Sequence, residues 1–114
     1  MVIQRGDVWW AALPEPVGSE PGYRRPVVIV QADSFNQSAI RTVIVVALTT
    51  NLRLADAPGN VLLQSGQTGL PKDCVANVSQ LITADRSFLT ERVSSLPVSS
   101  LERIEAGLRM ILDL

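Results

Sequence analysis

Residues 18–30 read GSEPGYRRPVVIV, a stretch that passes from a polar turn into an apolar strand. Glycine and proline in its first half are typical of a loop, and the β-branched run VVIV favours a buried strand. Pro26 stands at the junction, where its missing N–H disturbs strand pairing least. The proline also biases Arg25, the residue before it, toward an extended backbone. We therefore expect a long loop over residues 13–25 and a strand over residues 27–31.

The rest of the chain contains further short strands and one C-terminal helix. Residues 42–49 (TVIVVALT) are apolar on both faces of a strand, which is typical of a central position in a sheet. Near the C-terminus the apolar residues recur at helical spacing, and Ser99 with Glu102 forms a capping-box pattern ahead of them. We expect a helix over residues 100–112. The strands expected in all are residues 7–12, 27–31, 42–49, 61–63, 74–78 and 81–83.

These elements predict a mainly β (α+β) fold in one domain that spans residues 1–114. Several short strands, long loops and one amphipathic helix favour a small, strongly bent antiparallel sheet or barrel that the helix closes. The strands do not alternate with helices, which disfavours a parallel doubly wound fold. The sequence also lacks a glycine-rich phosphate loop, which argues against nucleotide hydrolysis.

The composition limits the chemistry that the chain can perform. It contains no histidine and one cysteine, Cys74, so the usual ligands of a zinc site are missing and we expect no metal. The net charge of −1 argues against a protein that coats nucleic acid, so any nucleic-acid site must be a local patch. No apolar run approaches the ~20 residues of a membrane span. A single cysteine fits a reducing compartment, and charged Arg5 and Asp7 come too early for a signal peptide, so we expect a cytoplasmic protein.

Arg25 and Thr49 are the strongest candidates for a catalytic site. Arg25 precedes Pro26 on a backbone that the following strand anchors, and a fixed guanidinium suits a phosphate or an oxyanion. Thr49 ends a second buried strand, and it lies beside Arg25 if the two strands are neighbours. The alternatives are that the arginines are solvated loop charges, one of them paired with Glu20, and that Thr49 and Asn51 only cap a turn.

Four aromatic residues, Trp9, Trp10, Tyr23 and Phe35, are candidates for stacking on nucleic-acid bases. Trp9 and Trp10 are adjacent in an expected strand, so their side chains should point to opposite faces. Most aromatic residues in a small domain are packed in the core, so we expect at least one of the tryptophans to be buried. Tyr23, in the expected loop, is the better stacking candidate.

The order of these segments resembles the MazF/PemK family of bacterial toxins. The similarity covers nearly the whole chain from Arg5, and its segments are RGDVWWA, GSEPGYRRPVVIV, DSFN, VIVVALTTN, PGNV, GLPKDCV and the terminal GL…ILDL. The resemblance implies an SH3-like barrel with a C-terminal helix that acts as a homodimer. It also implies a sequence-specific endoribonuclease that cleaves single-stranded messenger RNA without metal or cofactor, and a labile antitoxin that blocks the RNA groove.

The resemblance also assigns roles to particular residues. The family's catalytic arginine precedes the proline that ends the loop, which here is Arg25, and its catalytic hydroxyl ends the following long strand, which here is Thr49. The residues expected to bind RNA are Ser19, Glu20, Tyr23, Arg24, Asn36, Asn51 and Gln80. Two positions depart from the family pattern: Ile82 stands where many relatives carry an arginine, and Cys74 stands where serine is more usual.

The expected reaction uses the 2′-hydroxyl that RNA carries beside each phosphate. Attack by this oxygen cleaves the chain and leaves a 2′,3′-cyclic phosphate and a 5′-hydroxyl end. Arg25 suits stabilisation of the charged transition state, and Thr49 can donate a hydrogen bond to a nonbridging oxygen. Arginine stays protonated in proteins, so the general base is left open, with Glu20 as one candidate. An acidic, partly disordered antitoxin segment is expected to pair with Arg24 and Arg25.

Two other functions stay open at the level of the sequence. One is a noncatalytic toxin on the same scaffold, similar to the CcdB-like inhibitors of DNA gyrase. The other is a noncatalytic SH3-like RNA-binding module. An RNA-cleaving enzyme would fragment plain RNA in the presence of EDTA, whereas a binding module would retain the RNA intact.

Overall fold

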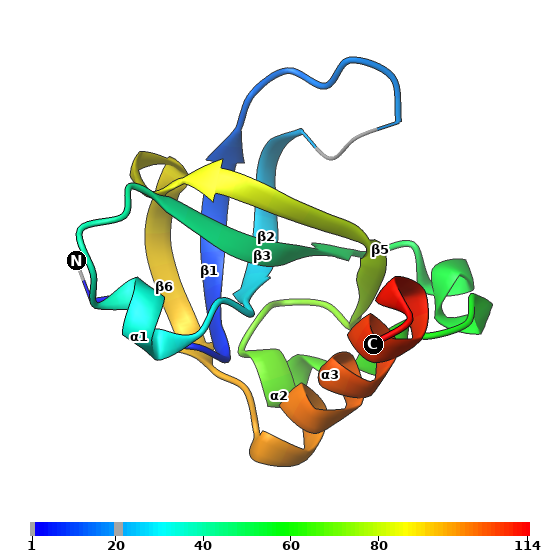
Figure 1. Ribbon diagram of the computed structural model, residues 1–114. Helices are drawn as coiled ribbons and strands as arrows, with labels where there is room; N and C mark the ends of the chain where they lie inside the picture. Colours follow the sequence, from blue (N-terminus) through cyan, green and yellow to red (C-terminus); the bar gives the residue numbers. More distant parts are fainter. Residues whose placement is uncertain (1, 20–21) are drawn as a thin grey trace.

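A computed structural model describes residues 2–19 and 22–114, and Figure 1 shows its curled sheet and C-terminal helix. Within these residues the sheet has six strands, paired antiparallel in the order β4-β5-β3-β2-β1-β6. The strands are β1 (Asp7–Leu13), β2 (Tyr23–Ile29), β3 (Thr42–Thr49), β4 (Val61–Leu63), β5 (Cys74–Asp85) and β6 (Leu89–Ser95). The helices are α1 (Asp33–Asn36), α2 (Ser65–Thr68) and α3 (Val98–Leu112), with short 3₁₀ helices η1 (Leu52–Asp56) and η2 (Arg86–Phe88). The expected mainly β architecture with a C-terminal helix is confirmed. None of the helices in the described residues is long and apolar enough to cross a bilayer.

Both faces of the sheet are buried, which explains the unbroken apolar run of β3. One face carries a core cluster that includes Val46 and Leu48, and Ile104 of α3 belongs to the same cluster. The other face carries a second cluster that includes Val43 and Val45. Successive side chains of a strand point to opposite faces, so a strand between two cores must be apolar on both. α3 covers one face, where it packs against β4 and β5, and the curl of the sheet encloses the other (Figure 1).

The two adjacent tryptophans of β1 take opposite faces, as expected. Trp9 is buried in the second cluster, with 6% of its surface exposed. Trp10 is only half-buried and packs against the first cluster. Trp9 is therefore a core residue, whereas the Trp10 ring is partly available at the surface.

β2 and β3 are paired along only part of their length. Their ladder joins residues 27–29 of β2 to residues 45–47 of β3. Residues 23–26 of β2 pair with β1 instead, and residues 48–49 of β3 pair with β5. The ladder ends next to Pro26, which has no N–H to donate to a neighbouring strand. The two strands consequently separate beyond Pro26, and this separation positions the candidate site.

The beginning of β2 differs from the expectation for residues 13–25. The prediction of a loop was wrong at its end, because residues 23–25 pair with residues 11–13 of β1. Pro26 consequently lies inside β2, opposite Trp10, and not at the start of the strand. An interior proline is tolerated here because the ladder to β3 has already ended.

β5 and β6 also differ from the predicted strands. β5 is one strand where two were expected, although its pairing with β3 shifts register between Val46 and Leu48, near the expected bend. β6 was not predicted, because its sequence LTERVSS presents exposed polar residues and gives little apolar alternation. β6 lies at an edge of the sheet, where exposed charged residues are typical. The apolar pattern of β6 is therefore too weak to predict this edge strand from the sequence.

α3 begins earlier than predicted and without the predicted cap. Its first residue is Val98, and Pro97 occupies the N-cap position with no side-chain hydrogen bond. The capping box expected for Ser99 and Glu102 was therefore wrong. Both residues lie inside the helix, so Ser99 cannot occupy the N-cap position that a capping box requires.

Gly107 of α3 and Gly59, which precedes β4, lie in direct backbone contact. A Cβ added to Gly107 would lie 2.0 Å from the carbonyl oxygen of Gly59. Alanine forms helices better than glycine by about 1 kcal/mol, so helix propensity alone would make Gly107→Ala stabilising. Any loss of stability in this variant must therefore come from the close contact with Gly59. We expect Gly107→Ala to lower the free energy of unfolding by about 1–3 kcal/mol, measured by urea denaturation.

Gly66 of α2 provides the matched control for this substitution. A Cβ added there meets no heavy atom within 4 Å. Gly66→Ala should therefore leave the free energy of unfolding unchanged or raise it slightly. Equal stability of the Gly107→Ala variant and the wild type would show that the close approach of α3 to residue 59 is not required.

Candidate active site

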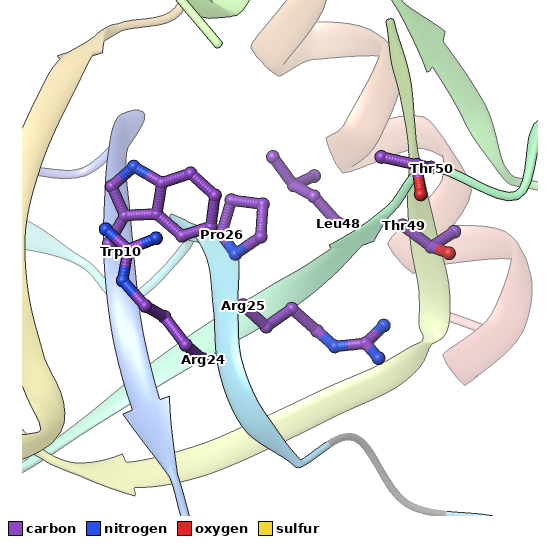
Figure 2. Close-up of a pocket in the computed structure, with 7 residues that line it drawn as sticks. All are labelled: Trp10, Arg24, Arg25, Pro26, Leu48, Thr49 and Thr50. Carbon is purple, nitrogen blue, oxygen red and sulfur yellow. The ribbon is translucent and has the colours of Figure 1, made fainter. Parts of the chain in front are cut away.

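The separation of β2 and β3 opens a pocket of about 250 Å³, which we call the Arg–Thr pocket. β1 and β2 form one side and the end of β3 forms the other (Figure 2). Its lining residues are Trp10, Arg24, Arg25, Pro26, Leu48, Thr49 and Thr50. The structure thus places both predicted catalytic residues in one pocket, which the sequence could suggest only if their strands were neighbours.

Arg25 extends from β2 across this pocket. Figure 2 shows its guanidinium pointing toward Thr49, and its side chain is half-buried. Among the residues that the structure describes, no carboxylate forms an ion pair with Arg25. The alternative partner that we considered, Glu20, lies outside the described residues. Within the described part of the chain, the Arg25 donors are therefore available to an anion bound in the pocket.

Thr49 presents its hydroxyl at the end of β3. The backbone N–H of Asn51 donates a hydrogen bond to Thr49 Oγ1 over 3.2 Å. The Asn51 side-chain oxygen in turn accepts from the N–H of Arg53 and caps η1. The turn-capping alternative is therefore also realised at Thr49 and Asn51. It does not use the Thr49 O–H as a donor, so this proton can be directed at a ligand in the pocket.

Arg24 has different partners from Arg25. Its guanidinium carbon lies 3.9 Å from the centroid of the Trp10 ring, in a cation–π contact. It also forms an ion pair with Glu91 of β6 over 3.8 Å. Both charged side chains are exposed, and an exposed ion pair contributes little to stability. Arg24 is therefore available to exchange Glu91 for a phosphate at the rim of the pocket.

Ser19 lies in the connection between β1 and β2, Tyr23 begins β2, and Gln80 lies in β5. Tyr23 begins β2 with a positive φ of 58°, which is unusual for a residue other than glycine, and 62% of its surface is exposed. The Gln80 side chain of β5 donates a hydrogen bond over 3.2 Å to the carbonyl oxygen of Ser19. This bond joins two predicted RNA-binding residues, one in the connection after β1 and one in β5.

Asn36 is placed away from the Arg–Thr pocket. It ends α1, which follows the opposite end of β2, and only 4% of its surface is exposed. Its amide donates to the carbonyl oxygen of Gln31 and to the carboxylate of Asp33. Hydrogen bonds from the Arg5 backbone and from Asn36 lower the pKa of Asp33. Asn36 thus holds α1 in place, so the structure gives no support to an RNA contact there.

The two departures from the family pattern are both packing positions. Ile82 of β5 pairs with Val45 and packs against the second core cluster. Cys74 is buried, and this burial, with a smaller contribution from the charge of Asp73, raises the pKa of the thiol to about 11. A thiol with a raised pKa stays protonated near neutral pH and is a poor nucleophile. Neither position therefore supplies a reactive group.

The described residues contain no group of three or more cysteine, aspartate or glutamate side chains placed to hold a metal ion. The groups that converge in the Arg–Thr pocket are instead hydrogen-bond donors. A planar guanidinium and a hydroxyl on opposite walls are suited to hold a phosphate group and to stabilise added negative charge on it.

Solved structures of other proteins share this fold. The structure of MazF from Deinococcus radiodurans matches with a TM-score of 0.84 and 21% sequence identity, covering 100% of this chain and 99% of that one. An endoribonuclease from Mycobacterial species, solved in complex with its cognate antitoxin, matches with a TM-score of 0.72 and 21% identity over 99% of this chain and 95% of that one. These likenesses establish the fold.

Sequence comparison gives the family. The model described as PemK-like, MazF-like toxin of type II toxin-antitoxin system matches residues 4–112. Endoribonuclease MazF6 of Mycobacterium tuberculosis is 45% identical over the full length of both chains. Endoribonuclease EndoA of Bacillus subtilis is 33% identical over 100% of this chain and 97% of its own. The chain belongs to the PemK-like, MazF-like toxin family of type II toxin–antitoxin systems, as its sequence segments indicated.

Proposed function

We propose that this toxin is an endoribonuclease whose Arg–Thr pocket cleaves single-stranded RNA, chiefly messenger RNA. The observation that carries the proposal is the convergence of Arg25 and Thr49, from two separating strands, on one pocket. The names of the full-length relatives, endoribonucleases MazF6 and EndoA, support the class of reaction. Family membership supports the biological role of a toxin.

The reaction that we propose is a transesterification within the RNA. The 2′-oxygen attacks the adjacent phosphorus and loses its proton to a base, the P–O5′ bond breaks, and the leaving 5′-oxygen takes up a proton. The products are a 2′,3′-cyclic phosphate and a 5′-hydroxyl. Arg25 stabilises the charge that accumulates on the phosphorane-like transition state, and Thr49 donates to a nonbridging oxygen. The general base stays unassigned, since the candidate Glu20 lies outside the described residues.

The remaining RNA contacts surround this pocket. We propose that Arg24 steers the phosphate backbone toward Arg25 and that Tyr23 stacks on a base. We further propose that Ser19, Asn51 and Gln80 contact the RNA outside the Arg–Thr pocket. The exposure of Tyr23 and of Arg24 supports this arrangement. Stacking on an exposed aromatic ring and charge attraction to phosphates are the usual means of binding single strands.

The proposed partners follow from the family. We propose that the toxin acts in the cytoplasm as a homodimer, in which two Arg–Thr pockets share one RNA channel. Light scattering at micromolar concentration measures the mass in solution, and the mass of a monomer would contradict the proposed dimer.

We further propose that the cognate antitoxin inhibits the toxin through an acidic, partly disordered segment that pairs with Arg24 and Arg25 and folds on contact. One solved structure of MazE–MazF from Deinococcus radiodurans shares this fold, with a TM-score of 0.80 and 20% sequence identity.

Incubation of the purified protein with a defined RNA in EDTA separates the proposed function from its alternatives. The proposal predicts RNA fragments with reproducible ends under these conditions. Retention of intact RNA would indicate an RNA-binding module. Inhibition of DNA gyrase without RNA fragmentation would indicate a CcdB-like toxin.

A further inference from the structure

A second pocket, of about 240 Å³, adjoins the Arg–Thr pocket, and we call it the apolar pocket. The two pockets share three lining residues, Trp10, Pro26 and Thr50. The other residues that line the apolar pocket come from the segment between α2 and β5, and they are Leu70, Pro71, Lys72 and Cys74. Because the walls are shared, a nucleotide whose phosphate lies at Arg25 has the apolar pocket beside it.

The two pockets differ sharply in chemistry. The Arg–Thr pocket has guanidinium and hydroxyl groups in its lining beside Trp10, Pro26 and Leu48, whereas the walls of the apolar pocket are almost entirely apolar. Leu70 and Cys74 are 5% and 1% exposed and belong to the first core cluster, so packing holds the inner wall in place. Trp10 forms part of the outer wall, and Figure 2 shows its indole next to the Pro26 ring.

We propose that the apolar pocket holds one unpaired base of the RNA, next to the phosphodiester bound at Arg25 and Thr49. This inference rests on the proposed ribonuclease function. A nucleotide joins a charged phosphate to a flat heterocycle, and the adjoining pockets, which share three lining residues, offer cationic groups in one and an almost entirely apolar surface in the other. The volume lies below the ~300–1,000 Å³ that is usual for pockets of drug-sized ligands, which suits a single heterocycle.

An apolar wall recognises a base by its shape and its stacking surface. Such a wall offers few donors or acceptors, so it cannot read the hydrogen-bonding edge of the base. The Arg24 guanidinium lies over one face of the Trp10 ring, so a base in the apolar pocket would use the rest of the indole surface. Such apolar contact is sequence-tolerant, because every base has a π-face. Loss of one stacked base should reduce kcat/KM by about 10- to 100-fold. The apolar pocket therefore anchors the nucleotide beside the cut, and any strict choice of base must come from other contacts.

The test uses a defined RNA that the wild-type protein cuts, with the nucleotides flanking the cut replaced one at a time. At one flanking position an abasic residue should lower kcat/KM by about 10- to 100-fold, and difluorotoluene, an apolar base isostere, should restore most of the rate. An absent penalty at every flanking position would overturn the inference. A value of kcat/KM as low with difluorotoluene as with the abasic residue would also overturn the inference, because the site would then recognise the base through hydrogen bonds.

Variants of the pocket wall connect this penalty to the apolar pocket. The loss of kcat/KM caused by the abasic residue should be smaller in Trp10→Ala and in Pro71→Ala than in the wild type, and a double-mutant cycle measures this difference. The loss should stay at its wild-type size in Trp10→Phe, which keeps an aromatic ring. Pro71 is exposed, so its variant tests the wall even if Trp10→Ala fails to fold. Val98→Ala, at an exposed position on α3, should keep the full penalty.

The outcomes distinguish this inference from the proposed function. A wild-type protein that cuts no RNA overturns both. Cleavage with an abasic penalty that is unchanged in Trp10→Ala and Pro71→Ala overturns the inference alone, and leaves the apolar pocket to another occupant such as a side chain of the antitoxin.

Discussion

Replacement of Arg25 by alanine should reduce RNA cleavage by about 10²- to 10³-fold while the fold survives. Arg25 is half-buried, its guanidinium points toward Thr49, and it has no ion-pair partner among the described residues, so its removal takes away a donor in the pocket and little structure. The loss should fall mainly on kcat, because the charge that Arg25 meets grows in the transition state. Single-turnover kinetics on a defined oligoribonucleotide measure this loss.

Two further variants control for the loss of positive charge. Arg25→Lys should recover only part of the rate, because an ammonium group cannot reproduce the planar fork of the guanidinium. Arg109→Ala, at an exposed position on α3, should cleave like the wild type. Full activity of an Arg25→Ala protein whose unfolding free energy matches the wild type would refute the assigned site.

Removal of the Thr49 hydroxyl should reduce cleavage by about 10²-fold. Thr49→Val keeps the shape and the β-branching that suit the end of β3, and it deletes only the oxygen. Thr49→Ser should retain most of the activity, because it keeps the O–H that is directed at the phosphate. Thr83→Val makes the same change at an exposed position of β5 and should have no effect on cleavage.

The Thr49 variant also tests whether the hydroxyl acts on the substrate or only on the turn. The hydroxyl accepts a hydrogen bond from the Asn51 N–H, so its loss weakens the turn as well. A purely structural role predicts that Thr49→Val and Thr49→Ser differ in unfolding free energy but not in kcat. If Arg25 and Thr49 act as one unit, the double variant should be barely slower than Arg25→Ala alone.

Much of the fold could be predicted from local sequence because its strongest signals are local. The run TVIVVALT is apolar on both faces, and it forms β3 with the expected bounds. The helical spacing of apolar residues near the C-terminus located α3 to within two residues at its start. The shared pocket of Arg25 and Thr49 could be anticipated because both residues stand next to buried strands.

The features that could not be predicted depend on tertiary contacts. Asn36 lies in a polar segment that reads as exposed, but α1 folds it under and its amide bonds to Gln31. The apolar pocket combines Trp10 with Leu70 and Pro71 from a distant connection, and no local motif marks these residues as neighbours. β6 was missed because an edge strand needs few apolar residues, and its pairing with β1 decides its structure.

The central claim is that Arg25 and Thr49 act on one phosphodiester while the neighbouring 2′-oxygen attacks it. The most direct test is the end chemistry of RNA fragments made by the purified protein in EDTA, with a matched RNA that carries one 2′-deoxynucleotide on the 5′ side of the cut. The account predicts 2′,3′-cyclic phosphate and 5′-hydroxyl ends, and no cleavage at the deoxy position. Fragments with 5′-phosphate ends, or unchanged cleavage of the deoxy-substituted RNA, would contradict it.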